Sequence, residues 1–569
     1  MPGSNAYNLV FGGAAGQGLA SIGQMMSKSL MRSGYCIVVT QDYQSRIRGG
    51  HNTFAIRFSP REIMASQKPV DLLVALNRET VNLEGVNLAE SGKIIEDKAD
   101  SSGHPRAIGV PFDELGSGRT KNVLAFGIAA CILGLDQALV RQVMDEFFGR
   151  RHPEAAKENE ETLARAFRWC AEDNVPSLEI EPPEKPGRGL MINGNEALAL
   201  GAISAGVKFY AFYPMTPSTS IGLTMAAQAE QMGLVVEQAE DEISAVNMAM
   251  GASFAGAPSM VGTSGGGFAL MTEGVSLAAM TETPIVIVIS QRPGPATGLP
   301  TRTAQGDLEF VLHAGHGEFP RAIFTPGSVE ECFYLARAAC FLAEQSQGPV
   351  FILTDQYQAD SLRAVSVFEV EQLASMDIGC EAAEAESPYE RYRITENGVS
   401  PRHIPGWTEN LVVADSDEHT PDGHLTEDLT AAEQMTRKRL RKLNILKEET
   451  IPPERWGVEH PDLLLVAWGS SKGPVIEAAQ LLSASGNRSV SALHFSQVWP
   501  LIPGHFLETL QGAREVVSVE GNATGQLARL IRRETGFEIA GSVLRFDGLP
   551  LTPEYIVENI SSAGGKREE

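Results

Sequence analysis

Short apolar runs alternate with amphipathic segments along this chain, and the alternation occurs in three successive stretches. In the first stretch, the apolar runs occupy residues 7–13, 36–40, 51–59 and 70–76. A segment over residues 19–32 places Ile22, Met25, Met26 and Leu30 on one face of a helix. Strands that alternate with helices predict a wound parallel sheet, so we expect the α/β fold class.

The second and third stretches repeat the pattern. Apolar runs occupy residues 208–214, 234–239, 258–264, 284–290 and 348–356, and then residues 462–469, 489–496 and 515–521. Predicted helices of the third stretch cover residues 473–485 and 525–535. We therefore expect three wound parallel-sheet domains in the 569 residues, which are too many for one ordinary core.

Two segments interrupt the pattern and suggest domain boundaries. Residues 153–188 combine a polar helix with a Pro/Glu-rich stretch that is typical of a linker. Residues 373–455 are rich in Glu, Asp, Pro and His, but Tyr389, Tyr392 and Trp407 can pack, which favours an extended ordered arm over disorder. The predicted division is a first α/β domain at 1–180, a linker at 181–189, a second domain at 190–372, the arm at 373–455 and a third domain at 456–569.

Charge and hydropathy exclude two classes of protein. The formal net charge of -25 argues against a protein that binds nucleic-acid duplexes, although Arg46, Arg48 and Arg61 could still form a local site for an anion. Apolar runs such as residues 284–289 are far shorter than the about 18 residues of a membrane span. The N-terminus lacks a basic region followed by an apolar stretch, so we expect a cytoplasmic protein without a membrane partner.

The cysteines argue against a metal centre on this chain. An iron–sulfur cluster takes four thiolates, at least some of them closely spaced, and no Cys-x-x-Cys pair occurs here. Disulfides are not expected in the cytoplasm. We expect no metal site, and small core positions for most of Cys36, Cys131, Cys170, Cys332, Cys340 and Cys380.

A glycine-rich turn follows the first predicted strand. Gly13, Gly16 and Gly18 are spaced G-x-x-G-x-G, which differs from the G-x-G-x-x-G dinucleotide fingerprint. From the spacing alone, a tight turn that binds nothing is the favoured interpretation. Arg46 and Arg48 precede a Gly-Gly pair, which suits either an anion site or a solvated hairpin.

The central stretch carries the most specific segments. Tyr213, Pro214, Met215, Thr216 and Pro217 end a strand, and the prolines fix the backbone at the carboxyl end of the sheet, where α/β folds bind ligands. Three further segments follow: an acidic run at 236–245, a glycine-rich run at 262–268 and a Pro/Gly-rich run at 291–303.

These four segments, in this order, resemble the alpha subunit of 2-oxoacid:ferredoxin oxidoreductases, most closely the 2-oxoglutarate type. Met215 replaces isoleucine in the family's Tyr-Pro-Ile-Thr-Pro, and Gly266 replaces proline in its Thr-Ser-Gly-Pro-Gly. The N-terminal turn and the RGGHN segment resemble the family's gamma domain, fused here ahead of the alpha part. Residues 498–500 and 519–522 resemble its transketolase-C-like domain. The resemblance covers essentially the whole chain.

The resemblance implies roles for individual residues. Glu242 would contact the aminopyrimidine N1′ of thiamine diphosphate and promote its imino tautomer, with Glu240 and Asp241 as alternatives. Thr216 would hydrogen-bond the substrate, Arg292 would hold the 2-oxoacid carboxylate, and Arg302 would be a second cation in the same loop. The remaining pyrimidine contacts would be Tyr213, Pro214, Ser264 and Gly265. Without the resemblance, Glu242 would be an ordinary acid in the first turn of a helix, Thr216 a turn-capping hydroxyl and Arg292 a surface charge.

The resemblance also implies cofactors and partners. Coenzyme A would bind near Gly16, Gln17, Gly18, Arg46 and Arg48. The family's diphosphate–magnesium motif is missing from this sequence, so Mg²⁺ and the [4Fe-4S] clusters would belong to a separate beta subunit in an (αβ)₂ assembly that reduces or oxidises ferredoxin. Two arginines favour 2-oxoglutarate, which is converted with coenzyme A to succinyl-CoA and CO₂. Pyruvate, branched-chain or aryl 2-oxoacids remain alternatives, as does a non-catalytic scaffold subunit.

Overall fold

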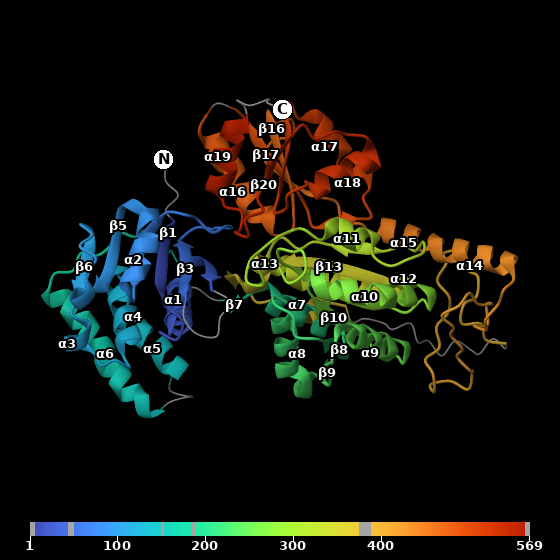
Figure 1. The fold of residues 1–569 in the computed structure, drawn as a ribbon, viewed down its shortest axis with the longest axis horizontal. Coiled ribbons are helices and arrows are strands. Elements are labelled where there is room, and N and C mark those ends of the chain that lie inside the picture. Colours follow the sequence, from blue (N-terminus) through green and yellow to red (C-terminus); the bar gives the residue numbers. More distant parts are fainter. Residues whose placement is uncertain are drawn as a thin grey trace. The chain divides into compact units, whose positions relative to one another are not determined.

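A computed structural model describes residues 6–43, 50–148, 153–184, 189–374, 388–486 and 488–563. The chain forms two compact units, which are coloured along the sequence in Figure 1. The first consists of Met1–Ile192 and Ser361–Val367, and the second of Asn193–Asp360 and Phe368–Glu569. The chain therefore leaves the first unit, returns to it for one short segment, and leaves it again.

The first unit is built on a mixed eight-stranded sheet with the order β6-β5-β4-β1-β3-β2-β14-β7. Its strands are β1 (Tyr7–Ala14), β2 (Cys36–Asp42), β3 (His51–Ser59), β4 (Val70–Ala75), β5 (Leu88–Asp97), β6 (Ala107–Val110), β7 (Leu190–Ile192) and β14 (Leu362–Val365). Strands β1, β4, β5 and β6 pair in parallel, whereas β3 is antiparallel to both β1 and β2. The sheet is thus not wholly parallel, because the segment between β2 and β3 is too short for a crossover.

Helices α1 (Leu19–Ser33), α4 (Lys121–Ile132), α5 (Gln137–Phe148) and α6 (Pro153–Glu172) supply the helical side of this unit's main core. Gly23 lets α1 approach the sheet closely, since a Cβ at this position would lie 2.3 Å from the ring of Phe54. The unit also contains the short helices α2 (Arg78–Glu84) and α3 (Phe112–Leu115).

The second unit contains a seven-stranded sheet with the order β18-β12-β13-β11-β10-β8-β9. Its strands are β8 (Phe209–Phe212), β9 (Val235–Gln238), β10 (Ser259–Thr263), β11 (Ile285–Gln291), β12 (Ala322–Phe324), β13 (Pro349–Asp355) and β18 (Gln497–Trp499). Only the edge strand β18 is antiparallel. Every residue of β10, β11 and β13 is buried, as expected for parallel strands that are covered on both faces. The helices are α7 (Gly194–Ala205), α8 (Thr219–Met232), α9 (Glu242–Phe254), α10 (Gly265–Met280), α11 (Leu308–His313), α12 (Val329–Ser346) and α13 (Gln356–Asp360).

The C-terminal part of the second unit forms a third sheet, with the order β15-β17-β16-β19-β20. It comprises β15 (Glu454–Trp456), β16 (Leu463–Trp468), β17 (Val490–Phe495), β19 (Val516–Glu520), β20 (Gly541–Leu544), α16 (Lys472–Ala484), α17 (Leu507–Gly512), α18 (Gln526–Thr535) and α19 (Pro553–Ala563). Phe351 and Leu353 of the central sheet share one hydrophobic core with Leu464, Val466 and Trp468 of this part. The predicted α/β class is confirmed.

An arm connects the central and C-terminal parts. Residues 388–428 lack helices and paired strands except for one bridge between His419 and Leu425, and α14 (Leu429–Arg441) and α15 (Leu443–Glu448) follow. The arm packs onto the C-terminal end of α10. There Tyr392 donates from its hydroxyl to the Thr281 carbonyl (3.3 Å), and Nε2 of His419 lies 3.3 Å from the Met280 carbonyl.

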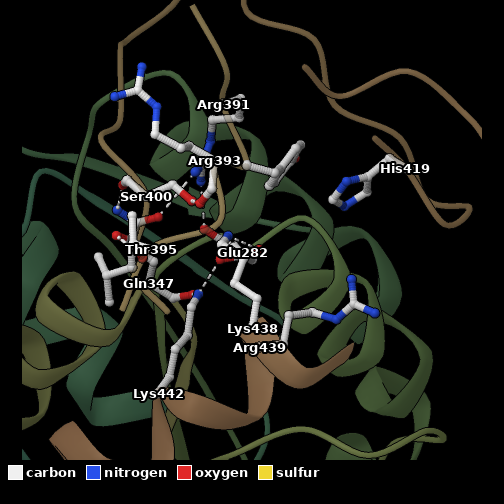
Figure 2. Close-up of polar contacts among 12 residues, drawn as sticks. Glu282, Gln347, Arg391, Arg393, Thr395, Ser400, His419, Lys438, Arg439 and Lys442 are labelled. Carbon is white, nitrogen blue, oxygen red and sulfur yellow. Dashed lines mark hydrogen bonds and ion pairs between the residues drawn. The ribbon is translucent and has the colours of Figure 1, made fainter. Parts of the chain in front are cut away.

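A buried ion cluster fastens this arm (Figure 2). The carboxylate of Glu282 pairs with Lys438 at 2.6 Å and with Lys442 at 2.5 Å, and the side chains of Glu282 and Lys438 are 0% exposed. Arg391 donates to the Glu282 backbone carbonyl at 2.8 Å. Burial alone would raise the pKa of Glu282, but Lys442, Lys438 and Arg391 together lower it to about 2. Burial lowers the pKa of Lys438 to about 7 despite the attraction of Glu282.

This cluster predicts a specific dependence of stability on pH. The pKa of Lys438 is about 7 in the folded chain against an ordinary 10.5. Between these values the unfolded chain binds one more proton, so the stability contribution of Lys438 rises with pH through this window. Lys438→Met should therefore gain stability relative to wild type at about pH 6 and lose that gain as the pH rises from about 7 to 10.5, as measured by denaturant unfolding. Exposed Lys447→Met is the control, and a pH-independent difference for Lys438→Met would contradict the prediction.

Within the described ranges, no helix is both long enough and apolar enough to cross a membrane.

Candidate functional site

The carboxyl ends of β8, β10 and β11 meet at one edge of the central sheet. Residues 213–218 follow β8, residues 264–267 follow β10, and a long loop at 292–306 follows β11. Parallel strands place the loops that follow them on the same edge, which is the usual ligand edge of such sheets. The segments singled out in the central part of the sequence are therefore gathered by the topology.

Glu242 is the first residue of α9 and is only 3% exposed. Asp241 before it caps the helix by accepting a hydrogen bond from the Ser244 backbone at 2.7 Å. Because Asp241 caps the helix, the Glu242 carboxylate is not needed for capping and can contact a ligand. Its Oε1 is buried without a hydrogen-bond partner among the described residues. Exposed Glu240 lacks this environment, so Glu242 is the best placed of the three consecutive acids.

The glycine-rich first turn of α10 packs closely against the Glu242 carboxylate. A Cβ on Gly267 would lie 2.3 Å from Glu242 Oε1 and 2.2 Å from Thr263 Oγ1, so only glycine fits there. Ser264 occupies the N-cap position of α10 but makes no capping hydrogen bond, and its buried hydroxyl has no partner in the described part of the chain.

Asp307 is a third buried group at the N-terminus of α10. It precedes α11 without capping it, and its carboxyl lies against Gly265, where an added Cβ would be 2.5 Å from Oδ2. Burial raises the pKa of Asp307 to about 6. The sequence analysis missed this residue, although an acid so soon after the Pro/Gly-rich run at 291–303 could have been noticed.

Three buried oxygen atoms around the N-terminus of α10 therefore have no partner among the residues described: Glu242 Oε1, Ser264 Oγ and Asp307 Oδ2. Buried polar atoms are nearly always hydrogen-bonded, so such a concentration marks a ligand site. A carboxylate that is poorly solvated can share a proton with a weak ring base. The donor set thus fits the aminopyrimidine of thiamine diphosphate, with Glu242 toward the ring nitrogen.

The close packing at Gly267 gives a direct test of this site. Gly267→Ala should push the Glu242 carboxylate aside and weaken thiamine diphosphate binding at least about tenfold, because misplacement of about 1 Å disrupts such geometry. Binding is measured by fluorescence titration of the assembled complex. Gly266→Ala is the matched control, since its Cβ would meet nothing closer than 3.6 Å. Equal affinities of the two variants would contradict the prediction.

Thr216 and Arg292 are brought together at the same edge. Arg292 donates through Nη1 to the backbone carbonyl of Thr216 at 2.7 Å, so the contact uses the threonine main chain and leaves its hydroxyl out. Partial burial lowers the pKa of Arg292. Tyr213 and Pro214 are exposed next to them. The pair can present a cation and a hydroxyl to one ligand.

Arg302 lies at the other end of the loop, against the C-terminal part. A Cβ on Gly548 would be 3.0 Å from the Cβ of Arg302. The structure therefore gives Arg302 a neighbour in the C-terminal part, and its role as a second substrate cation stays a prediction.

The predicted coenzyme A residues lie in the first unit. Gly16 and Gly18 adopt positive φ values of 91° and 76°, and Gln17 accepts a hydrogen bond from the Ala14 backbone at 2.6 Å. Gly18 directly precedes α1, so the turn presents the N-terminus of that helix. Arg46 and Arg48 lie outside the described residues. Coenzyme A binding here stays a prediction.

Comparison with known proteins identifies the family. Residues 200–438 match the family described as pyruvate flavodoxin/ferredoxin oxidoreductase, thiamine diP-bdg, and residues 8–169 match pyruvate ferredoxin/flavodoxin oxidoreductase. Subunit alpha of 2-oxoacid:ferredoxin oxidoreductase 2 from Aeropyrum pernix is 30% identical over 96% of this chain and 95% of its own. The 2-oxoglutarate oxidoreductase subunit KorA of Mycobacterium tuberculosis is 28% identical over 97% and 91%.

A solved structure agrees with these relatives. The 2-oxoglutarate:ferredoxin oxidoreductase from Magnetococcus marinus, with 2-oxoglutarate, coenzyme A and succinyl-CoA bound, superimposes with a TM-score of 0.91 at 29% identity, over 98% of this chain and 99% of that one. The predicted resemblance and the enzyme class are confirmed. The chain belongs to the family of thiamine diphosphate-dependent 2-oxoacid:ferredoxin oxidoreductase alpha subunits.

Proposed function

We propose that this chain supplies the pyrimidine side of a thiamine diphosphate site that converts 2-oxoglutarate, coenzyme A and oxidised ferredoxin to succinyl-CoA, CO₂ and reduced ferredoxin, in either direction. The observation that carries the proposal is the group of three buried oxygens without a partner among the described residues at the N-terminus of α10, one of which belongs to Glu242. When bound, thiamine diphosphate supplies the nucleophilic carbon that decarboxylation of a 2-oxo acid requires.

The residues of this chain then have separate tasks. Glu242 holds and returns a proton at the pyrimidine N1′, and its burial strengthens that interaction. Arg292 binds the carboxylate next to the oxo group, and Thr216 donates its hydroxyl to the substrate. We further assign pyrimidine contacts to Tyr213, Pro214, Ser264 and Gly265, and the distal carboxylate of the substrate to Arg302.

The choice of 2-oxoglutarate is supported by relatives whose names contain this substrate, among them the proteins from Mycobacterium tuberculosis and Magnetococcus marinus. A purified complex of this chain with its partner should be assayed on 2-oxoglutarate, pyruvate, a branched-chain oxoacid and an aryl pyruvate. We expect kcat/KM to be highest for 2-oxoglutarate by at least about 100-fold, because a site that hydrogen-bonds a second carboxylate discriminates strongly against substrates that lack it. A preference for another oxoacid would refute the substrate assignment and leave the reaction type intact.

The partner is proposed to be a beta subunit that carries the diphosphate and Mg²⁺ sites and [4Fe-4S] clusters, in a cytoplasmic (αβ)₂ complex. Large apolar side chains beside Glu242 support a partner at this face. Ile243 of α9 and Leu270 of α10 are each 50% exposed, and Met248 is 43% exposed. Co-purification should recover a smaller chain with clustered cysteines, and recovery of this chain alone as an active enzyme would refute the proposal.

Coenzyme A is proposed to bind the first unit at Gly16, Gln17 and Gly18, with Arg46 and Arg48 as phosphate partners. The helix N-terminus that follows Gly18 supports an anion at this turn. Titration calorimetry of the assembled complex should detect coenzyme A, and Arg46→Ala/Arg48→Ala should weaken it. Binding of NAD with no binding of coenzyme A would contradict the assignment.

A further inference from the structure

The loop that carries Arg292 is closed at its base and held at both ends. It leaves β11 after Gln291 and ends at Asp307, whose backbone N–H donates to Gln291 Oε1 at 2.9 Å. The outgoing end is held within the central part by the hydrogen bond from Arg292 to the Thr216 carbonyl. At the returning end, residues 302–306, the Thr303 hydroxyl accepts from the Tyr357 N–H at 3.3 Å within the central part, and further contacts lead to the C-terminal part.

The C-terminal part holds the backbone of this returning end. The Thr303 N–H donates to the Gly548 carbonyl at 3.1 Å, and the Gln305 N–H donates to the Gly521 carbonyl at 2.7 Å. Gln526 at the start of α18 donates from Nε2 to the Gly306 carbonyl at 2.8 Å. Three backbone contacts of residues 303–306 therefore come from two segments of the C-terminal part, one at Gly548 and one at 521–526.

The side chain of Gln305 reinforces this attachment. It is 2% exposed and enters the C-terminal part, where Nε2 donates to the Trp468 carbonyl at 2.8 Å. Its Oε1 accepts from the Gly521 N–H at 2.7 Å and from the Ser471 hydroxyl at 3.0 Å. Both ends of the amide are thus satisfied by partners in the C-terminal part.

Glu520 and Asn522 fix the receiving surface. The Glu520 carboxylate is 0% exposed and accepts hydrogen bonds from Trp468 Nε1 (3.1 Å), Asn522 Nδ2 (2.9 Å) and the backbones of Leu527 (2.9 Å) and Ala528 (3.1 Å). Asn522 Nδ2 also donates to the Gln305 carbonyl at 3.1 Å. Four donors, two of them at the N-terminus of α18, satisfy a carboxylate that has no ion pair among the described residues.

We propose that Gln305, Glu520 and Asn522 form a loop clamp, through which the C-terminal part positions Arg292 for the 2-oxoacid. This inference rests on the proposed function of Arg292. The clamp residues do not touch the substrate and act through the loop, so they are positioning residues. Displacement of the returning end shifts the loop base at Gln291, which adjoins Arg292, and a shift of about 1 Å can cost a factor of about 100.

The test uses Gln305→Leu in the assembled complex, because leucine has a similar size and removes the amide contacts. We expect KM for the 2-oxoacid to rise at least about tenfold, by a larger factor than the affinity for thiamine diphosphate falls. Gln497→Leu is the matched control. Gln497 is also 2% exposed. Its Oε1 accepts from the Ile451 N–H and its Nε2 donates to the Trp499 carbonyl, and both of these partners lie outside the loop that carries Arg292.

A double-mutant cycle with Arg292→Ala separates positioning from simple destabilisation. If the clamp acts through Arg292, Gln305→Leu adds less than about twofold to the effect of Arg292→Ala on kcat/KM. Additive effects, or an unchanged KM with a lowered melting temperature like that of Gln497→Leu, would overturn the proposal. If Gln305→Leu does not assemble, Asn522→Ser gives the same readout through the Gln305 carbonyl. Failure of the wild-type complex to turn over any 2-oxoacid would instead refute the proposed function.

Discussion

Glu242→Gln should lower the turnover of the assembled complex by about 100-fold to 10,000-fold, while leaving its folding and assembly intact. Glutamine keeps the size of the side chain and its place against Gly267, but it cannot exchange a proton with a ring nitrogen. Loss of a positioned acid–base group typically has an effect of this size. The measurement is steady-state reduction of ferredoxin at saturating 2-oxoacid, with thiamine diphosphate occupancy determined in parallel.

The neighbouring acids provide controls for this variant. Glu240→Gln changes an exposed carboxyl two residues away and should leave turnover within about twofold of wild type. Asp241→Asn keeps an N-cap residue and should also be mild, since asparagine caps helices as well as aspartate does. Near-normal turnover of Glu242→Gln would favour the scaffold interpretation, and a large effect of Glu240→Gln would reassign the acid.

Glu282→Gln should be the most destabilising single change where the arm packs onto the end of α10, with a loss of about 3–5 kcal/mol in the free energy of unfolding. The substitution removes the one carboxylate that lies among Lys438, Lys442 and Arg391, so buried cations lose their counter-charge (Figure 2). Denaturant midpoints measure the effect, and hydrogen exchange of residues 388–448 shows whether the arm is the segment released.

The comparison variant for Glu282→Gln is Lys438→Met at neutral pH. It removes a cation whose burial is unfavourable and leaves Glu282 paired with Lys442 at 2.5 Å, so we expect no loss of stability. Equal losses from the two variants would mean that removal of the carboxylate is no worse than removal of one surrounding cation. That result would contradict our account of the lowered Lys438 pKa.

Much of this architecture could be predicted because its signals are local. Apolar runs with glycine at their ends gave the strands, and the segment after β8 placed Thr216 at the ligand edge. Glu242 could be chosen among three acids only with the family resemblance, and the structure adds the physical reason, because Asp241 is used in capping.

The rest depends on contacts between residues far apart in the sequence. Lys438 meets Glu282 across 156 positions, and Gln305 meets Gly521 across 216, so neither pairing has a local pattern. Asp307 has an ordinary helix-start sequence, and only its position against Gly265 reveals that it does not cap. The antiparallel β3 follows from a short connection that the alternation of strands and helices did not reveal.

The return of the chain to the first sheet has a consequence for dissecting the protein. Strand β14 lies between β2 and β7 and is antiparallel to both, although it is encoded after most of the central sheet. A fragment that stops near residue 180 would lack both β14 and β7, and the free backbone groups of β2 would form an open edge prone to pairing with another copy. A stable fragment would need residues 361–367 joined to it, so the first unit is better expressed as a rejoined polypeptide than as a simple truncation.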